Sequence, residues 1–345
     1  MRSQWWHRDV HAGRRPVLIV RNAIASAIRS YFADEDFIEI DAAALQFSPG
    51  NETHIHAFPV ALNRLDGASL LRYLHTSPEF AMKKLLAAGE TKIFSMSHVF
   101  RDRERGPLHA PEFTMLEWYR AGVNYRRIIE DCLKILELAL KASQSQAFRY
   151  RLQSADLNAE ARMITLAEAF SRYADIDLLA TCLDDAVASR DALARAAMRA
   201  GLTVREADGW SDIFSRVMVA LIEPKLALEG VCVLHQYPRS EAALAALNSE
   251  DARLADRFEL YVCGVELANG FRELTDAAEQ RRRFEASMEE KQRLYGERYP
   301  IDEEFLAALP AMPEASGVAL GFDRLVMLAT GAPSIDHVLW TPVES

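Results

Sequence analysis

The chain has 345 residues, half of them hydrophobic, which is enough for one large domain or two smaller ones. Its 40 basic and 50 acidic residues give a formal net charge of -10, so long stretches of nucleic acid are unfavourable partners. The four cysteines form no CxxC pair, so we expect no cysteine-type zinc site. There is no signal-peptide core and no run of about 18 apolar residues, so we expect a cytoplasmic protein without a membrane span.

Hydrophobic periodicity and turn residues divide the chain into short strands with helices set among them. In chain order, the expected elements are a helix over 17–33, strands over 37–40 and 71–74, a helix over 79–88, strands over 93–101 and 113–120, a helix over 125–141, a mostly helical middle over about 160–228, strands over 230–237 and 257–271, and helices over 277–294 and 322–329. Because βαβ units do not alternate regularly, this order predicts an α/β (α+β) fold with a mainly antiparallel sheet flanked by helices.

A charged loop over 102–112 separates two of the predicted strands. The first strand ends in Arg101, and on the second the period of two places Phe113, Met115, Glu117 and Tyr119 on one face. A carboxylate, a phenol and a ring aligned in this way suit the floor of a polar pocket. A surface hairpin with a half-solvated face is the alternative.

Residues 257–267 have the pattern of a β-hairpin with a two-residue turn at 263–264. This turn pairs Tyr261 with Glu266 and makes Glu259 a diagonal neighbour of Glu266 on the same face. Diagonal pairs lie roughly 7–8 Å apart, a span that a divalent cation can bridge. Two solvated glutamates on an exposed face are the alternative.

The second strand of this hairpin continues with Asn269, Phe271 and Glu273 on one face. Gly270 is expected to supply a bulge that turns these side chains into the same site. An edge strand with a bend would explain the same pattern without a site.

A strand of small residues over 317–321 leads into the apolar helix and lets a ligand approach the backbone closely. Arg324 falls in the first turn of that helix, where the helix dipole favours negative groups rather than positive ones. An anionic ligand would remove this conflict, because Arg324 and the free N–H groups would both face it.

Together these segments resemble the motifs of class II aminoacyl-tRNA synthetases, in the branch of the lysyl, aspartyl and asparaginyl enzymes. The helix and strand over about 17–43 look like motif 1, which forms the dimer interface in the family. Residues 93–120, with Pro-Glu-Phe-Thr at 111–114, look like motif 2, and residues 317–329 look like motif 3. The resemblance implies one catalytic domain over 1–345 and a homodimer.

Three strings give the resemblance a lysyl character: His-Thr-Ser-Pro-Glu at 75–79, Met-Leu-Glu-Trp-Tyr at 115–119, and the run over 266–276. They look closest to the lysyl-tRNA synthetase paralogues that modify translation elongation factor P. This resemblance implies that a lysine-type amino acid, (R)-β-lysine, is adenylated with ATP and passed to the ε-amine of a lysine on that factor. Only 16 residues precede Val17, fewer than the roughly 50 that a domain needs, so we expect no anticodon-binding barrel and no tRNA acceptor.

The resemblance also implies roles for individual residues. Catalysis is expected of Arg101, Arg324 and Glu266, because guanidinium forks suit phosphate and the reaction needs positioning and charge stabilisation rather than a nucleophile. ATP binding is expected of Arg101, Asp102, Arg103, Glu104, His109, Ala110, Phe113, Glu266, Leu267, Gly321 and Arg324. Mg²⁺ binding is expected of Glu259 and Glu266. The substrate amino acid is expected to be held by Ser77, Pro78, Glu79, Glu117, Tyr119, Asn269, Phe271, Glu273 and Ala319. Several carboxylates in one pocket repel one another, so a dicationic ligand gives a physical reason for them.

Four positions depart from the family pattern. Arg103 stands where motif 2 has a glutamate, with Glu104 after it, and Ala110 replaces an asparagine that contacts ATP. Ala43 replaces the proline at the end of motif 1. Ala319 replaces a glycine of true lysyl-tRNA synthetases and adds a methyl group to the pocket wall, which favours a substrate other than α-lysine.

Two other functions fit the same resemblance. One is an enzyme that charges tRNA with the help of a separate partner, which the acidic charge makes unfavourable. The other is a non-catalytic paralogue that binds an amino acid and regulates another protein. Retention of the two phosphate arginines and the two metal carboxylates favours an enzyme.

Overall fold

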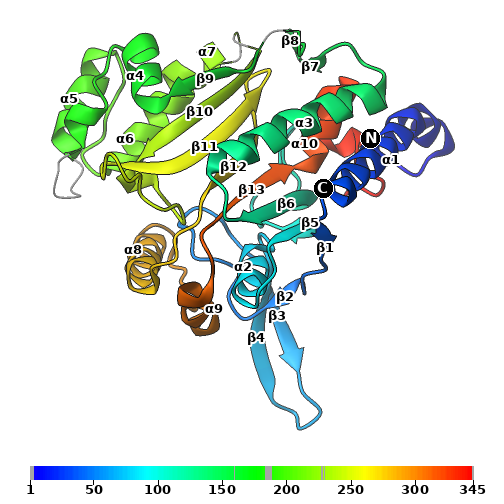
Figure 1. Ribbon diagram of the computed structural model, residues 1–345, viewed down its shortest axis with the longest axis horizontal. Helices are drawn as coiled ribbons and strands as arrows, with labels where there is room; N and C mark the ends of the chain where they lie inside the picture. The colour runs from blue at the N-terminus through cyan, green and yellow to red at the C-terminus, as the bar shows by residue number, and fades with distance from the viewer. Residues whose placement is uncertain (1–3, 159, 183–188, 227, 229, 344–345) are drawn as a thin grey trace. The chain divides into compact units, whose positions relative to one another are not determined.

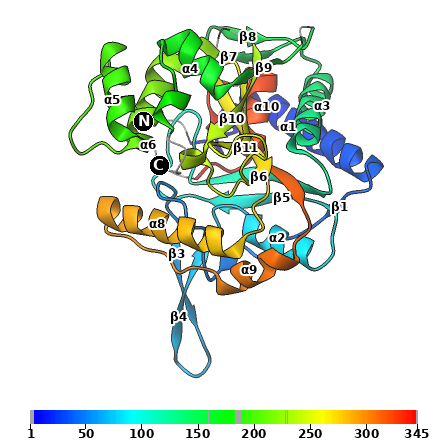
Figure 2. The same ribbon diagram turned by 60° about the vertical axis from the view of Figure 1, so that its left-hand side comes forward.

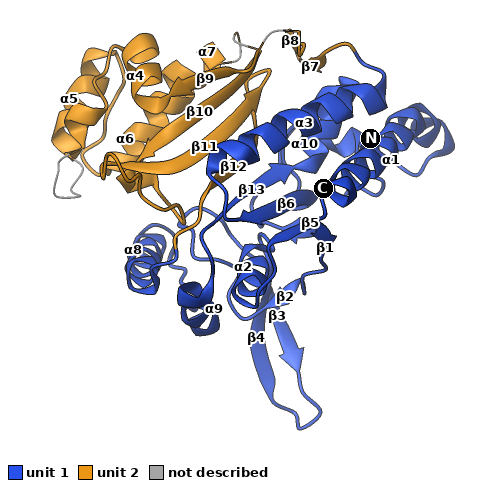
Figure 3. Cartoon of the chain, viewed as in Figure 1, with its two compact units in different colours: residues 1–145, 275–345 blue, residues 146–274 orange. Residues whose placement is uncertain are grey.

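The computed structural model describes residues 4–158, 160–182, 189–226, 228 and 230–343. The chain divides into two compact units, unit 1 with residues 1–145 and 275–345 and unit 2 with residues 146–274 (Figure 3). Each unit contains strands flanked by helices, and most strand pairs are antiparallel, as expected. The single catalytic domain over 1–345 stays a prediction.

Unit 1 is built on four strands in the order β1-β5-β6-β13. Their bounds are β1 Ile38–Glu39, β5 Lys92–Phe100, β6 Glu112–Ala121 and β13 Ala315–Gly321. β1 runs parallel to β5, and the other pairs are antiparallel. In this register Glu117 lies in the middle of β6, between Ser95 of β5 and Ala319 of β13.

The helices of unit 1 pack against one another and on these strands (Figure 1). They are α1 Arg8–Asp34, α2 Glu79–Ala87, α3 Tyr125–Ser143, α8 Ala277–Tyr295, α9 Glu303–Ala308 and α10 Phe322–Thr330, with short 3-10 turns η4 Leu309–Ala311 and η5 Ile335–His337. The face of α1 predicted to be apolar is buried at Leu18, Ile24, Ile28 and Phe32. The Phe32 ring stacks on Phe94 of β5 with 4.5 Å between centroids, which fixes α1 on the sheet.

Helix α1 begins at Arg8, nine residues before the predicted start, so that predicted boundary is wrong. Its first turns are polar and contain Pro16, so periodicity and helix propensity gave no signal for them. A tertiary contact holds them instead, because the buried Arg14 guanidinium donates to the backbone carbonyls of Asp336 and Leu339 near the C-terminus.

A small three-stranded sheet in the order β2-β4-β3 extends away from the rest of unit 1 in both views (Figures 1 and 2). Its strands are β2 Leu45–Gln46, β3 Pro59–Asn63 and β4 Ser69–Leu74. Only residues 71–74 were predicted as a strand. β3 contains a proline and is mostly exposed, so it lacks the alternation that marks a half-buried strand.

Unit 2 has four strands in the order β12-β11-β10-β9, with helices packed on one side of them. The strands are β9 Arg162–Thr165, β10 Val231–Pro238, β11 Leu254–Val262 and β12 Val265–Arg272, with a separate hairpin β7 Phe148–Tyr150 and β8 Gln153–Ala155. The helical elements are α4 Leu166–Ala174, η1 Leu179–Thr181, α5 Arg190–Arg199, α6 Trp210–Val217, the π-helical turn η2 Met218–Ile222, α7 Glu223–Leu226 and η3 Arg239–Glu241. The mostly helical middle expected over about 160–228 is therefore confirmed for its described residues.

The predicted hairpin of unit 2 is present, but its bulge lies elsewhere. Cys263 and Gly264 both have positive φ, +52° and +75°, as a tight two-residue turn requires, and Tyr261 pairs with Glu266 as predicted. Gly270 pairs regularly with Phe258, so the bulge predicted at Gly270 is wrong. The register instead shifts between Leu260 and Tyr261, which leaves an extra residue on β12.

This shift has a consequence for which side chains share a face. Glu266 and Asn269 are three residues apart and would point to opposite faces of a regular strand. The extra residue between them brings Asn269 opposite Glu259, so that it shares a face with Glu266. The two predicted groups of side chains therefore lie on one face of unit 2.

No helix among the described residues is both long and apolar enough to cross a membrane. All four cysteines are described, and each is a free thiol.

Candidate active site

The polar side chains expected to share a face of β6 form a buried cluster in unit 1, and Ser77 connects this cluster to a pocket that Glu79 also lines. The Tyr119 hydroxyl donates to Glu117 Oε1 at 2.6 Å, which confirms that the two side chains share a face, and the Ser77 hydroxyl donates to Glu117 Oε2 at 2.7 Å. Glu117 is only 1% exposed, so the alternative of a half-solvated surface hairpin is wrong. Ala319 stands beside Glu117 on the neighbouring strand.

Helix α2 adds a second carboxylate to this pocket. Pro78 is the residue before its first turn, and the Glu79 N–H is capped by the Ser77 hydroxyl at 3.0 Å. The Glu79 carboxylate forms a 2.5 Å ion pair with Lys83 one turn later, and the Lys83 side chain is 1% exposed. Burial, and then the Glu79 charge, raise the pKa of Glu117 to about 7. The pocket therefore holds more negative charge than its own lysine neutralises, which suits a cationic ligand.

Two arginines of unit 1, Arg101 and Arg324, are the residues for which the resemblance implies phosphate contacts, and that role stays a prediction. Arg101, at the end of β5, donates to the Thr76 carbonyl at 3.3 Å and lies over the Phe113 ring at 5.3 Å. Arg324, in the first turn of α10, donates to the Leu108 carbonyl at 3.2 Å and lies 2.9 Å from His109 Nε2. Both guanidinium groups are thus held by backbone carbonyls and remain partly exposed.

Gly321, the residue before α10, lies directly against Arg324. A Cβ added at Gly321 would meet the Arg324 side chain at 3.5 Å, which is an ordinary van der Waals contact. The neighbouring Asp323 is buried, accepts from the Thr114 N–H at 2.7 Å and pairs with Arg21 of α1. Through these two contacts Asp323 links the motif 1, 2 and 3 segments of unit 1.

The loop over 102–112 shows what replaces the expected motif 2 glutamate. Arg103 has a φ of +64°, and its guanidinium pairs with Glu297 and lies 6.0 Å from the Tyr295 ring. Asp102 caps the Arg103 N–H at 2.8 Å, and Glu104 lies 3.7 Å from Arg101. Because the Arg103 side chain is directed to Glu297, its role in ATP binding stays a prediction.

In unit 2 the carboxylates lie on the hairpin face described above. Glu259 is 8% exposed and accepts from Tyr261 and from Arg257, each at 2.7 Å, while Arg257 also donates to Asn269 at 3.1 Å. Glu259 is therefore not a solvated surface glutamate, whereas Glu266 is exposed. Burial, Glu259 and Glu266 all raise the pKa of Tyr261, which shows that the two charges lie near the same ring.

This donor set fits Mg²⁺ in its chemistry, since carboxylate oxygens are the ligands that the ion prefers and each keeps lone pairs beyond its present hydrogen bonds. No group of three or more His, Cys, Asp or Glu placed to hold a metal is found among the described residues, so a metal here would rely on the pair and on substrate phosphates. Of the other residues expected in this unit, Leu267, Phe271 and Glu273 are buried. Their roles stay predictions.

One residue of the unit 1 pocket was missed by the sequence analysis. Glu52 lines the same pocket as Ser77 and Glu79. It lies in the irregular segment between β2 and β3, where no periodicity marks a face. Its only local signal is the preceding Gly50, whose φ of +114° disfavours other residues.

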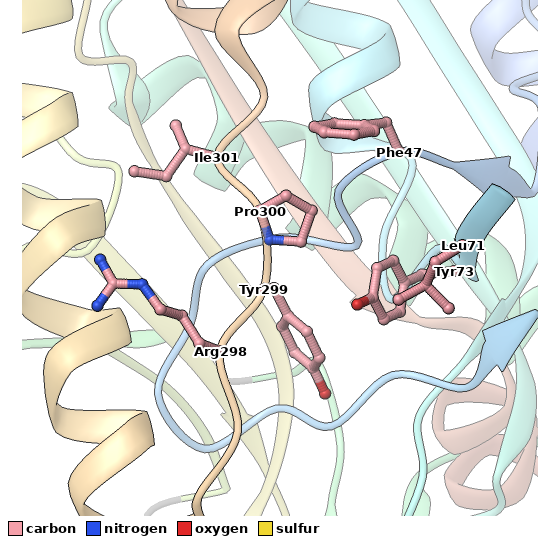
Figure 4. A pocket seen from close by; sticks show the side chains of 7 residues that line it. All are labelled: Phe47, Leu71, Tyr73, Arg298, Tyr299, Pro300 and Ile301. Atoms are coloured by element: carbon pink, nitrogen blue, oxygen red, sulfur yellow. The ribbon is translucent and has the colours of Figure 1, made fainter.

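A separate cavity of unit 1 is lined mostly by apolar and aromatic side chains (Figure 4). Its lining residues are Phe47, Leu71, Tyr73, Arg298, Tyr299, Pro300 and Ile301. None of them was a predicted site residue. It contains no carboxylate to compensate an amine, so we place the candidate active site in the carboxylate pocket instead.

Comparison with known proteins agrees with this geometry. The family model for tRNA synthetases class II (D, K and N) matches residues 3–345. The chain is 40% identical to the elongation factor P--(R)-beta-lysine ligase of Proteus mirabilis, over 94% of each protein. It is 38% identical to the ligase of the same name from Erwinia tasmaniensis, over 95% of each, and 36% identical to that of Vibrio parahaemolyticus, over 93% of this chain and 94% of the relative.

Proposed function

Because the chain belongs to the family of class II tRNA synthetases (D, K and N), we propose that it is a ligase that activates a lysine-type amino acid with ATP and transfers it to a lysine ε-amine on translation elongation factor P. The expected amino acid is (R)-β-lysine, after the names of its relatives. The family match includes both compact units, which supports a single catalytic domain over 1–345.

The carboxylate pocket of unit 1 is the observation that carries the proposal. Glu117 is buried with a raised pKa, and Glu79 stands close enough to add to that rise. Two carboxylates confined in this way are stabilised by an ammonium ligand and destabilised without one. A diamino acid supplies such groups, whereas aspartate and asparagine would bring an additional acid or an uncharged amide.

The reaction has two steps. The amino acid carboxylate attacks the α-phosphorus of ATP and pyrophosphate leaves, and then the acceptor amine attacks the acyl carbon and AMP leaves. In this reaction Arg101 would neutralise charge at the α-phosphate and Arg324 at the γ-phosphate, with Phe113 against adenine. No side chain forms a covalent intermediate, so these residues act by positioning and by charge stabilisation.

Mg²⁺ supplies additional neutralisation of triphosphate charge when it is bound. Glu259 and Glu266 would hold it, and exposed Glu266 is the carboxylate accessible to a ligand. Arg257 fixes Glu259 and Asn269 in place by donating to both.

We also infer a homodimer through the motif 1 segment over about 17–43. Ile19 of α1 and Ile38 of β1 are large apolar side chains that are 46% and 54% exposed in the single chain. Burial of such residues against a second copy would remove apolar surface from water. Sedimentation velocity of the purified protein tests this inference, and a monomer at micromolar concentration would contradict it.

Pyrophosphate exchange into ATP tests the activation step. We expect exchange with β-lysine to exceed that with α-lysine, and none with aspartate or asparagine. Glu266→Ala should abolish it while the protein remains folded. No exchange with any amino acid would contradict the proposal and would favour a non-catalytic paralogue that binds an amino acid.

A further inference from the structure

We propose that Glu52 is a further specificity-determining residue, which receives the substrate ammonium group nearest the reacting carboxylate, and that Lys291 is a positioning residue that holds the Glu52 segment in place. This inference rests on the proposed function and deepens it.

The Glu52 carboxylate is folded back over Gly50. A Cβ added to Gly50 would lie 2.6 Å from Glu52 Oε2 and 3.5 Å from the Thr76 hydroxyl, so a side chain at position 50 would push the carboxylate out of this position. The carboxylate therefore faces residues 76–79, and it lines the pocket that contains Ser77 and Glu79. In the structure the carboxylate therefore lies against the pocket residues rather than in open solvent.

Charged neighbours locate Glu52 along the pocket. Burial and the Glu79 charge raise the pKa of Glu52, while Arg101 and Lys291 oppose that rise. Glu117, in contrast, is influenced by Glu79 and Lys83. The contacts agree with these influences, because Arg101 donates to the carbonyl of Thr76, whose hydroxyl lies beside Gly50 together with the Glu52 carboxylate, whereas Glu117 accepts from Ser77. If Arg101 contacts the α-phosphate as proposed, the substrate carboxylate that reacts would lie on the Glu52 side of the pocket.

The charges of the pocket then match a diamino acid. Glu52, Glu79 and Glu117 supply three carboxylates, and the 2.5 Å ion pair with Lys83 offsets one of them. Glu52 and Glu117 are then each able, when ionised, to compensate one of the two ammonium groups of a lysine-type substrate. An amino acid with a single ammonium group would leave one carboxylate uncompensated.

Two buried polar atoms without hydrogen-bond partners mark the same pocket as a ligand site. Ser48 and His75 line it and are 3% and 2% exposed. The Ser48 hydroxyl and His75 Nδ1 have no hydrogen-bond partner among the described residues. Buried polar atoms are normally satisfied, so unused groups beside Glu52 point to a ligand or to water that a ligand displaces.

Lys291 explains how the Glu52 segment keeps its shape. This residue of α8 is 0% exposed, and its ammonium donates to the backbone carbonyls of Glu52, Thr53 and Ile55 at 3.4, 3.0 and 2.6 Å. An ammonium has three N–H donors, so all three serve this backbone. The Tyr299 ring, which also lines the cavity of Figure 4, lies 4.7 Å from the same ammonium.

A buried charge is costly unless its hydrogen bonds are satisfied. The three carbonyls therefore stabilise the buried Lys291 ammonium, and the ammonium in turn holds the three carbonyls in place. A purely structural lysine would affect the stability of the fold alone. A positioning lysine would in addition affect recognition of one ammonium group of the substrate. The two roles can therefore be separated by the choice of amino acid in the assay.

The experiment compares Glu52→Gln with the wild type in pyrophosphate exchange, with β-lysine, α-lysine and 6-aminohexanoate, which lacks the ammonium group near the carboxylate. We expect the KM for both diamino acids to rise about 10- to 100-fold, as when a charge-assisted hydrogen bond is lost, with the KM for ATP and for 6-aminohexanoate nearly unchanged. Glu289→Gln, an exposed glutamate on the same helix as Lys291, is the matched control and should behave as the wild type.

Thermal denaturation without substrate gives a second readout. Removal of one of three confined carboxylates should leave the melting temperature of Glu52→Gln equal or higher, whereas a structural role would lower it. Equal KM changes for the diamino acids and 6-aminohexanoate, or none at all, would overturn the assignment of Glu52. Absence of exchange in the wild type would instead overturn the proposed function, so the two failures are distinguishable.

Lys291→Met tests the positioning role. It should raise the KM for the diamino acids, and the double variant with Glu52→Gln should show no further rise, because both changes disable the same contact. Where Lys291→Met does not fold, Lys291→Arg replaces it, since it keeps the charge but not the three-carbonyl geometry. Additive KM changes, or a loss of stability with unchanged KM values, would overturn this role.

Discussion

The buried carboxyl of Glu117 gives a prediction whose size follows from the structure. Glu117 is 1% exposed, and its pKa is raised from 4.5 to about 7 by burial and by Glu79. A carboxyl with a higher pKa in the folded protein binds its proton more tightly there. Its contribution to stability is therefore present below about pH 4.5 and is lost as the pH rises through about 7.

The size of this loss sets the expected effect of Glu117→Gln. The difference between 7 and 4.5, at about 1.4 kcal/mol per pH unit, gives a loss of about 3 kcal/mol in the free energy of unfolding. Glutamine has the same shape, and the hydroxyls of Ser77 and Tyr119 can reorient to keep both hydrogen bonds. The variant should therefore match the wild type near pH 5 and exceed its stability by up to about 3 kcal/mol at pH 8.

Thermal denaturation between pH 5 and 8 without substrate measures this divergence. For a chain of this length, about 3 kcal/mol corresponds to a difference in melting temperature of about 4 °C. Saturating lysine at pH 8 should stabilise the wild type more than the variant, because the ligand ammonium compensates the ionised carboxylate. If the difference in melting temperature between Glu117→Gln and the wild type is the same at every pH, the assignment of a raised pKa to Glu117 is refuted.

Three further predictions concern other parts of the molecule. Asp131 is 0% exposed and accepts from Tyr31, Trp118 and Arg120, so Asp131→Asn should reduce the free energy of unfolding by about 3 kcal/mol; an unchanged melting temperature would count against this network. Arg324→Lys should lower kcat/KM for ATP about 10- to 100-fold because an ammonium cannot replace a guanidinium fork, and steady-state exchange kinetics equal to the wild type would exclude the phosphate role. Chelation of metal ions by EDTA should stop pyrophosphate exchange, and added Mg²⁺ should restore it. Glu266→Ala should need more Mg²⁺ than the wild type if any activity remains. Exchange that continues in EDTA would contradict a role for the metal in activation.

Local patterns predicted the parts of the site that depend on neighbouring residues. The period of two on β6 placed Glu117 and Tyr119 on one face, and their 2.6 Å hydrogen bond confirms it. The turn at 263–264 fixed the pairing of Tyr261 with Glu266 in the same way. In both cases the geometry is set within a few residues of chain, where sequence spacing is sufficient information.

Features that depend on distant contacts could not be predicted from spacing. The extra residue on β12 follows from how the strand must pack, and it moves Asn269 to the face of Glu259. Lys291 belongs to a highly charged helix, so the sequence favours a solvated side chain, yet the Glu52 segment, more than 200 residues earlier in the chain, buries it. Pairing with Glu297 likewise redirects Arg103.

Transfer of β-lysine to elongation factor P is the step that distinguishes the proposed ligase from an enzyme that only activates the amino acid. The purified chain would be incubated with ATP, Mg²⁺, (R)-β-lysine and elongation factor P, and the intact mass of the factor measured with and without ATP. We expect the mass of the factor to increase, only when ATP is present, by the mass of one lysyl residue attached to a single lysine side chain. We expect no increase in mass with the Arg101→Ala variant. If the same enzyme preparation exchanges pyrophosphate with β-lysine but leaves the factor unmodified, the proposed acceptor is contradicted. Only the activation step would then be supported.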